Sequence, residues 1–105
     1  MGEKLESPRY ALSYRAEPIA VGRLFALEFS VCPKTGARFP ENVRVDASMP
    51  EHKHGMNYRP TVTVRAAGGY RAEGMMFHMP GRWELVFELR AAGRTERLAK
   101  SIVLE

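Results

Sequence analysis

The sequence predicts an all-β fold, an immunoglobulin-like antiparallel β-sandwich of about seven strands. Apolar and polar residues alternate with a period of two in several short segments, turn residues separate these segments, and no stretch shows sustained helical periodicity. About seven short strands in a chain of this length are typical of such a sandwich. A small closed barrel is the alternative architecture.

The expected strands follow one another at short intervals. The first lies near Tyr10–Tyr14, and the second, residues 25–31, places large apolar side chains at every second position. Shorter alternating segments follow at residues 43–47, 62–64 and 70–73. Residues 83–89 alternate clearly, and residues 94–104 can pair back on them across the turn at residues 91–93. The side chains expected to be buried between the sheets are Phe25, Leu27, Phe29, Trp83, Leu85 and Phe87.

Length and composition indicate one domain, residues 1–105, in which residues 1–8 are expected to be a flexible or artificially added N-terminus. The hydrophobic content of 45% and the charged content of 27% are those of a globular protein. The net charge of +4 is spread along the chain, with no run of more than three like charges, so nucleic-acid binding is not expected. No apolar run is long enough to span a membrane. The polar N-terminus shows no export signal, and a removed signal or membrane anchor stays open.

Cys32 is the only cysteine, which excludes an intramolecular disulfide and a cysteine-based zinc site. It lies on the polar side of the second expected strand, so we expect it to be partly exposed. The sequence also contains no nucleophile motif, no glycine-rich phosphate loop and no paired carboxylates at an evident pocket. A blue-copper site needs a cysteine ligand beside two histidines, and Cys32 is too distant from the histidines to provide it. The protein is therefore not expected to be an enzyme or an electron carrier.

Histidine and methionine cluster in one window of the chain. All three histidines and all five internal methionines fall between Met49 and Met79. Imidazole and thioether ligands suit copper, and thioether selects the soft Cu(I) ion. Zinc could use the histidines, but the thioethers would then have no role. The expected metal ligands are His52, His54, Met56, His78 and Met79, with Met49 and Met76 as further candidates.

The two halves of the cluster differ in their local geometry. In a locally extended segment, His52, His54 and Met56 share one side and Lys53 points away. Two prolines, a glycine and an asparagine mark residues 49–60 as a loop. In the second half, His78 and the next residue face opposite ways on a regular strand and could reach one ion only if the chain bends there.

Each of these residues also has a packing interpretation. Met49 could complete the apolar face of residues 43–47, and Met75 and Met76 could fill the core or its rim. A histidine on a strand is more often a hydrogen-bonded structural residue than a ligand. An apolar, methionine-rich patch could also bind a protein partner without any metal. This metal-free interaction module is the alternative function.

The two segments together resemble the YtkA-like and FixH-like families of small bacterial domains. The resemblance is carried by Asp46–Met56 and Gly74–Leu85, with Pro18 and Gly22 before the first long strand, and extends from Pro18 to Leu104. It implies a periplasmic or otherwise extracytoplasmic sandwich domain linked to copper handling and respiratory oxidase assembly. The expected role is to carry Cu(I) to a membrane or periplasmic protein that receives copper, and membrane anchoring of the natural chain stays open.

Overall fold

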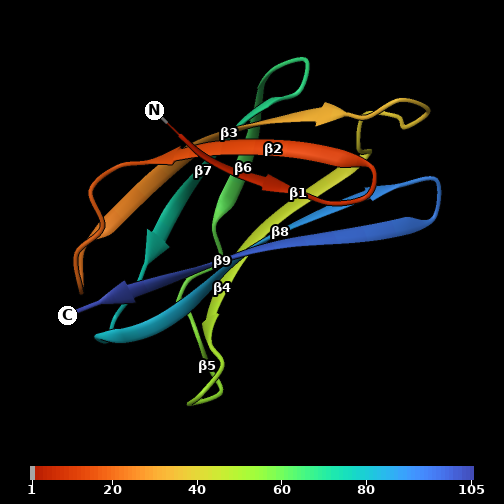
Figure 1. The fold of residues 1–105 in the computed structure, drawn as a ribbon. Helices are drawn as coiled ribbons and strands as arrows, with labels where there is room; N and C mark the ends of the chain where they lie inside the picture. The colour runs from red at the N-terminus through yellow and green to blue at the C-terminus, as the bar shows by residue number, and fades with distance from the viewer. Residues whose placement is uncertain (1) are drawn as a thin grey trace.

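Two antiparallel β-sheets face each other in the computed structural model, which describes residues 2–105 (Figure 1). The part of the chain that it describes contains no helix, and so none that could cross a membrane. The strands are β1 (Glu3–Glu6), β2 (Tyr10–Ala16), β3 (Leu24–Pro33), β4 (Asn42–Met49), β5 (His54–Gly55), β6 (Thr61–Ala66), β7 (Gly69–Met76), β8 (Gly81–Ala91) and β9 (Arg94–Leu104).

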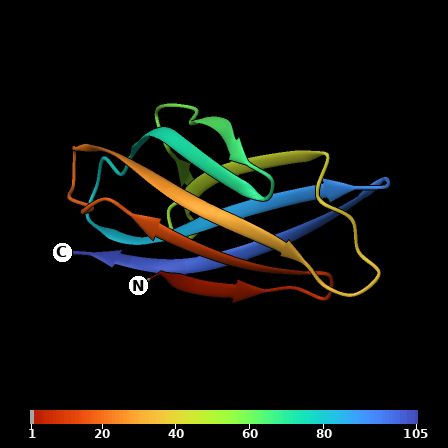
Figure 2. The ribbon, with the colours of Figure 1, turned by 90° about the horizontal axis from the view of Figure 1, so that it is seen from above.

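The strand order is that of an immunoglobulin-like sandwich. One sheet has the order β1-β2-β3-β7-β6 and the other β5-β4-β8-β9 (Figure 2). Strands β2, β3, β7 and β6 take the places of strands A, B, E and D of that fold, and β4, β8 and β9 those of C, F and G. The predicted all-β sandwich is confirmed, with nine strands among residues 2–105 in place of about seven.

The two additional strands, β1 and β5, carry little sequence signal. The sequence predicts a flexible N-terminus for residues 1–8, but Glu3–Glu6 pair with β2 from Glu3↔Tyr14 to Glu6↔Ala11. Three of the four side chains of β1 are exposed, so the strand shows almost no apolar alternation. Strand β5 has only two residues, which is too short for any periodicity. Met1 lies outside the described residues.

The core is built by aromatic side chains from both sheets. Phe25, Leu27 and Phe29 on β3 and Trp83, Leu85 and Phe87 on β8 are each at most 3% exposed, as the alternation predicts. The rings of Phe29 and Phe87 meet across the sheets with centroids 5.0 Å apart. Burying one such side chain contributes about 1.5–3 kcal/mol. This contact therefore helps hold the two sheets face to face.

Trp83 is fully buried where β8 begins. Its ring stacks on Phe77 with centroids 4.6 Å apart and planes 6° from parallel. Its indole N–H donates a hydrogen bond of 3.0 Å to the carbonyl oxygen of Met79. The two contacts fix both ends of the segment between β7 and β8.

Trp83→Ala should lower the free energy of unfolding by roughly 3–5 kcal/mol, because it leaves a large cavity and removes the indole donor. Urea denaturation followed by far-UV circular dichroism measures the change. Val103→Ala, at a position 67% exposed on β9, is the matched control and should change the free energy by less than about 0.5 kcal/mol. A near-neutral Trp83→Ala would contradict the role given to this side chain.

Candidate metal centre

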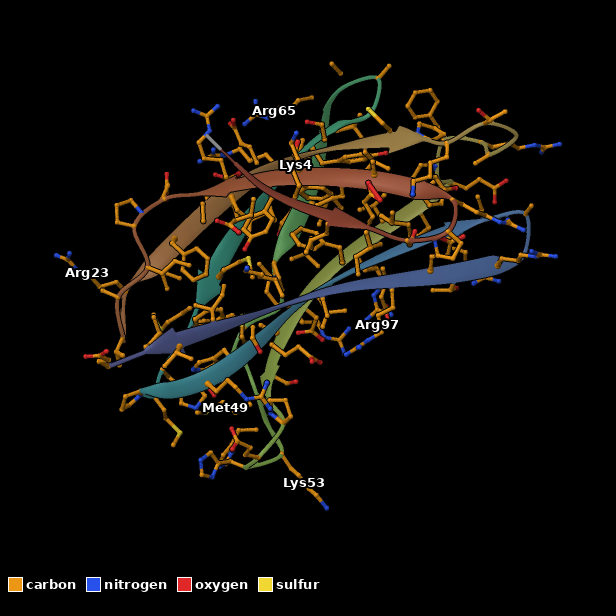
Figure 3. All side chains as sticks on the ribbon, in the orientation of Figure 1. Lys4, Arg23, Met49, Lys53, Arg65 and Arg97 are labelled. Atoms are coloured by element: carbon orange, nitrogen blue, oxygen red, sulfur yellow. The ribbon has the colours of Figure 1, made fainter. Side chains whose placement is uncertain are left out.

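The first histidine segment is a tight hairpin that projects from the end of β4. Strand β5 returns along β4 with Met49 opposite His54. Between them, the backbone N–H of His52 donates to the carbonyl oxygen of Met49 at 3.1 Å, and Lys53 has a positive φ of 55°. Lys53 points outward from the tip (Figure 3). His52 and His54 are both exposed, so the hairpin presents two imidazoles to solvent.

The second segment, Phe77–Pro80, is a crossing loop that leads from one sheet to the other. The sequence allows a regular strand here, but β7 ends at Met76. Phe77 is fully buried, and its carbonyl oxygen accepts a hydrogen bond of 2.9 Å from the N–H of Gly22. His78 and Met79 are half-buried. Because this loop is not a strand, the opposed orientation expected for these two side chains does not apply.

Three close approaches join the hairpin to the crossing loop and to the first residues of β8 at one end of the sandwich. The imidazole centroids of His54 and His78 lie 6.4 Å apart. The carboxylate of Glu51 pairs with the guanidinium of Arg82 at 3.1 Å. Gly81, with a φ of +127°, lies so close to Met49 that an added Cβ would be 2.6 Å from the Met49 methyl carbon. The two halves of the histidine and methionine cluster therefore form one surface.

The role of Arg82 and the packing of Met49 against Gly81 are the features here that the sequence does not predict. A glycine after proline signals a turn, but not that a methionine from another strand will pack against it. The contact between Glu51 and Arg82 joins residues that are 31 positions apart and gives no local pattern. Both depend on the sheet pairing, which only the folded chain shows.

The methionines divide into two groups. Met49 and Met75 belong to the core, at 1% and 0% exposure, so the structure gives Met49 a packing role rather than an accessible ligand position. Met56 and Met79 are half-buried and pack against the edge of the core. Met76 is half-buried and lies opposite Leu24 of β3 in the sheet register. Met56 and Met79 are therefore the methionines that adjoin the histidines in sequence and stay partly accessible.

The described residues contain no group of three His, Cys, Asp or Glu side chains close enough together to hold a metal ion. The three imidazoles thus do not form a three-nitrogen site of the kind that zinc uses. Glu51, the carboxylate beside His52, is paired with Arg82. Cys32 is exposed, as the sequence predicts, and lies on β3. A metal site at this surface would need thioether ligands to complete it.

His78 carries an unpaired polar atom. Its Nδ1 is buried and has no hydrogen-bond partner, and no other buried side-chain nitrogen or oxygen in the described part of the chain lacks one. The ring stands edge-on to Trp83 with centroids 5.5 Å apart. A buried polar atom without a partner costs about 1–3 kcal/mol. The Nδ1 of His78 is therefore a nitrogen that a ligand could satisfy.

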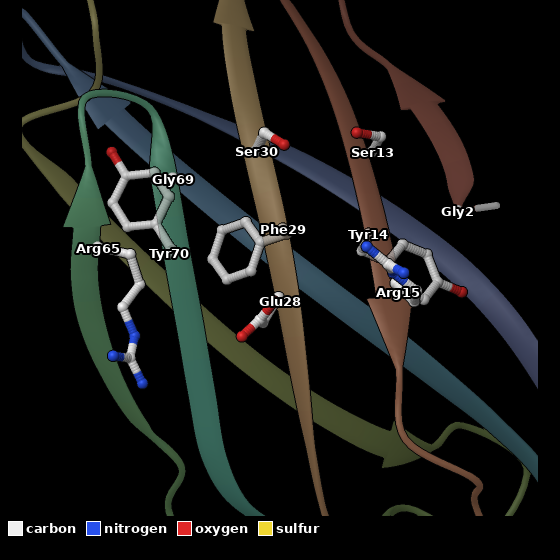
Figure 4. A pocket seen from close by; sticks show the side chains of 10 residues that line it. All are labelled: Gly2, Ser13, Tyr14, Arg15, Glu28, Phe29, Ser30, Arg65, Gly69 and Tyr70. Carbon is white, nitrogen blue, oxygen red and sulfur yellow. The ribbon is translucent and has the colours of Figure 1, made fainter.

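A separate hollow of about 620 Å³ lies over β2, β3, β6 and β7 (Figure 4). Its lining includes the charged side chains of Arg15, Glu28 and Arg65, and no histidine or methionine. Small-molecule sites are usually lined by apolar side chains with a few polar groups placed among them. This hollow offers mixed, exposed charges, and the histidine surface remains the better candidate for function.

His78→Leu should leave the metal-free protein as stable as before, or stabilise it by up to about 1 kcal/mol, because it removes an unpaired buried nitrogen. Urea denaturation measures this change. His52→Leu, at an exposed position, is the control and should stay within about 0.5 kcal/mol of the parent protein. A loss of stability well beyond that in His78→Leu would show that the imidazole has a structural role.

Comparison with known proteins matches one family. Residues 9–88 fit the family described as YtkA-like, a range that contains the hairpin, the crossing loop and most of β8. A search of curated proteins gave no match, and neither did a search of solved structures.

Proposed function

This chain belongs to the YtkA-like family, and we propose that it is an extracytoplasmic copper-binding domain that holds Cu(I) between its hairpin and its crossing loop. The proposed ligands are His54 and His78, with the thioethers of Met56 and Met79. His52 lies at the outer edge of the same surface. The proposal rests on the chemistry of these side chains and on their placement at one end of the sandwich.

The observation that carries the proposal is the buried Nδ1 of His78. This nitrogen has no hydrogen-bond partner, yet its ring lies 6.4 Å from that of His54, centroid to centroid. Burying a polar atom is unfavourable unless something binds it. In the neutral tautomer with the proton on Nε2, Nδ1 carries a lone pair that no hydrogen bond uses. A cation at this position would compensate the cost of burying that nitrogen.

The thioethers favour Cu(I) over harder ions. Thioether sulfur is a soft ligand that selects Cu(I), whereas carboxylates suit magnesium, calcium and manganese. The carboxylate next to His52 in sequence, that of Glu51, is paired with Arg82 at 3.1 Å. Met56 and Met79 are only half-buried, and methionine has an unbranched, adaptable side chain. These two side chains can adjust to an ion without rebuilding the core.

Copper would be cargo in this protein. Thioethers bind without losing a proton, so binding by them does not depend on deprotonation. Exposed ligands can exchange with those of another protein, which transfer requires. We propose delivery to a membrane or periplasmic protein that receives copper, as in respiratory oxidase assembly. The family membership and the resemblance of the two segments support this setting.

A metal-free interaction module is the second candidate. Leu24, which lies opposite Met76, is 63% exposed, and Val21 is 38% exposed in the turn that contacts Phe77 through Gly22. Exposed apolar side chains beside methionines are typical of surfaces that bind other proteins. This alternative needs no convergence of nitrogen and sulfur ligands, so copper titration separates the two.

We expect the reduced protein to bind about one Cu(I) ion per chain, and more tightly than Zn²⁺, because thioethers complete the site. Titration against a chromogenic Cu(I) chelator measures stoichiometry and affinity, and a zinc indicator gives the comparison. Absence of Cu(I) uptake would contradict the proposal and favour the interaction module. Tighter zinc binding would show that the thioethers take no part.

His54→Ala and Met79→Leu should each weaken Cu(I) binding by about tenfold or more, the scale seen when the surroundings of a metal ion are altered. The double variant should lose less than the sum of the two free-energy changes, because both side chains bind one ion.

Met49→Leu is the matched control for the thioether. It removes a sulfur from the core and keeps the volume, so Cu(I) affinity should not change and the stability cost should stay below about 1.5 kcal/mol. Strictly additive losses in the double variant would instead indicate two separate weak sites.

A further inference from the structure

Strand β6 is an exposed edge of the five-stranded sheet. It ends the order β1-β2-β3-β7-β6, with β7 on one side and, within residues 2–105, no strand of the sheet on the other (Figure 1). Five of its six residues are exposed, and Val64, at 68%, is the most exposed large apolar side chain of those residues. Alternate residues of an edge strand direct backbone N–H and C=O groups outward without a partner. This edge can therefore accept another extended strand.

The other sheet edges have neighbours. The edge strands β1 and β9 are joined by an ion pair of 3.2 Å between Glu3 and Lys100. On the second sheet, β5 pairs with the end of β4 at Ser48 and Met49. Strand β6 is thus the edge on which an added strand meets the least obstruction.

A hollow lies beside each face of β6. The hollow over β2, β3, β6 and β7 lies on the outer face of the sheet, where Glu28 and Ser30 are exposed, and it reaches Arg65 of β6 (Figure 4). A second hollow of about 330 Å³ separates β6 from β4 on the inner face, where Val62 packs against the edge of the core. Side chains of a strand alternate between the two faces of its sheet. A strand added to β6 would therefore direct side chains toward both hollows.

The chain around β6 is cationic. Residues 52–72 contain one lysine and three arginines and no aspartate or glutamate. Arg71 of β7 is paired with three glutamates, including Glu28 at 3.1 Å. The ion pairs formed within residues 2–105 leave out both Arg59 and Arg65. Two guanidinium groups beside this edge are therefore open to a carboxylate from another molecule.

The carboxylates already present in the hollows are engaged elsewhere. Asp46, which lines the inner hollow together with Arg59, accepts the backbone N–H of Ala47 at 2.8 Å. Glu28 of the outer hollow is held by Arg71. Guanidinium groups bind carboxylates through paired, charge-assisted hydrogen bonds. The charge of this surface is therefore complementary to an acidic ligand.

We propose that β6 binds an extended, acidic segment of a partner protein as an additional strand of the sheet. Backbone hydrogen bonds along the edge hold the segment, and its side chains provide the selectivity. Apolar side chains of the segment lie beside Val62 and Val64, and its carboxylates pair with Arg59 and Arg65. This binding does not depend on copper.

Local structure limits the length of the segment and its identity. Pro60 precedes the strand, and a register shift between Val64 and Ala66 makes Arg65 a bulge, so the regular edge is residues 61–64. A second copy of this chain is a poorer occupant, because pairing of two β6 strands would bring the arginines of both copies together. The segment is therefore short and carries the opposite charge.

A synthetic peptide of about seven residues that alternates glutamate with valine, with glutamate at both ends, is the probe. Titration into the ¹⁵N-labelled protein, followed by amide chemical shifts, should perturb residues 61–66 and the facing amides of the two hollows. Binding should weaken as salt is raised, because exposed charges are screened. A peptide with proline in place of every valine has the same charge but cannot donate the ladder hydrogen bonds, and should not bind.

Charge reversal tests the two arginines. Arg59→Glu and Arg65→Glu should each weaken binding of the acidic peptide by about tenfold or more, because like charges then face each other. A peptide with lysine in place of glutamate should bind these variants better than the parent protein. Arg23→Glu makes the same change in net charge at an exposed position far from Arg65 (Figure 3) and should leave binding within about twofold of the parent. Circular dichroism establishes that each variant is folded.

Four outcomes would overturn the proposal. The first is the absence of shift changes with the acidic peptide, and the second is equal binding of the proline peptide, which would show attraction by charge alone. The third is perturbation centred on β1, β4 or β9. The fourth is a dimer in sedimentation equilibrium whose formation shifts the amides of β6 without peptide, which would make a second copy the occupant.

Discussion

The segment between β7 and β8 has to cross from one sheet to the other, and the stacking of Phe77 on Trp83 fixes how it does so. Both rings are fully buried, and the indole N–H holds the carbonyl oxygen of Met79. Between these two rings, His78, Met79, Gly81 and Arg82 are half-buried and Pro80 is exposed. The position of the candidate ligands is thus set by the packing of their neighbours. Without that anchored crossing, the hairpin of β4 and β5 would face no second histidine.

The close approach of Met49 to Gly81 links this anchor to the hairpin. Met49 is the last residue of β4, and its methyl group occupies the space that a side chain at Gly81 would need. The ion pair of Glu51 with Arg82 adds a second link at the surface. Exposed ion pairs contribute little to stability, at most about 1 kcal/mol. The pairing of β4 with β8, which extends to Ser48↔Glu84, therefore sets the relative placement of the two loops, and the methionine contact and the ion pair add to it.

Much of the fold could be predicted because a strand that buries one face has an apolar side chain at every second position. The core side chains of β3 and β8, and the hairpin at Ala92 and Gly93 with φ values of 53° and 75°, follow from this alternation and from turn chemistry. Strand β1 could not be predicted in the same way, because it adds to the edge of a sheet by backbone pairing and buries almost nothing. Edge strands of this kind leave no apolar signature.

The candidate site was predictable in composition but not in detail. The clustering of histidine and methionine in one window identified the residues, because those side chains are chemically distinctive. Which methionines are accessible depends on packing between distant strands, and Met49 turned out to fill the core although it adjoins the histidine hairpin in sequence. The unpaired Nδ1 of His78 depends on the orientation of one ring beside Trp83, which no sequence pattern encodes.

The hairpin extends from the four-stranded sheet, and the crossing loop begins where the five-stranded sheet ends, so an ion shared by His54 and His78 would be a cross-link between distant parts of the chain. The two residues are 24 positions apart in sequence. Closing a loop of that length costs an unfolded chain conformational entropy, and a ligand that binds only the folded state stabilises that state by mass action. Bound copper would then hold the hairpin and the crossing loop together reversibly at this end of the sandwich. A chain that had not folded could not retain its cargo, so correct folding would itself limit which molecules carry copper.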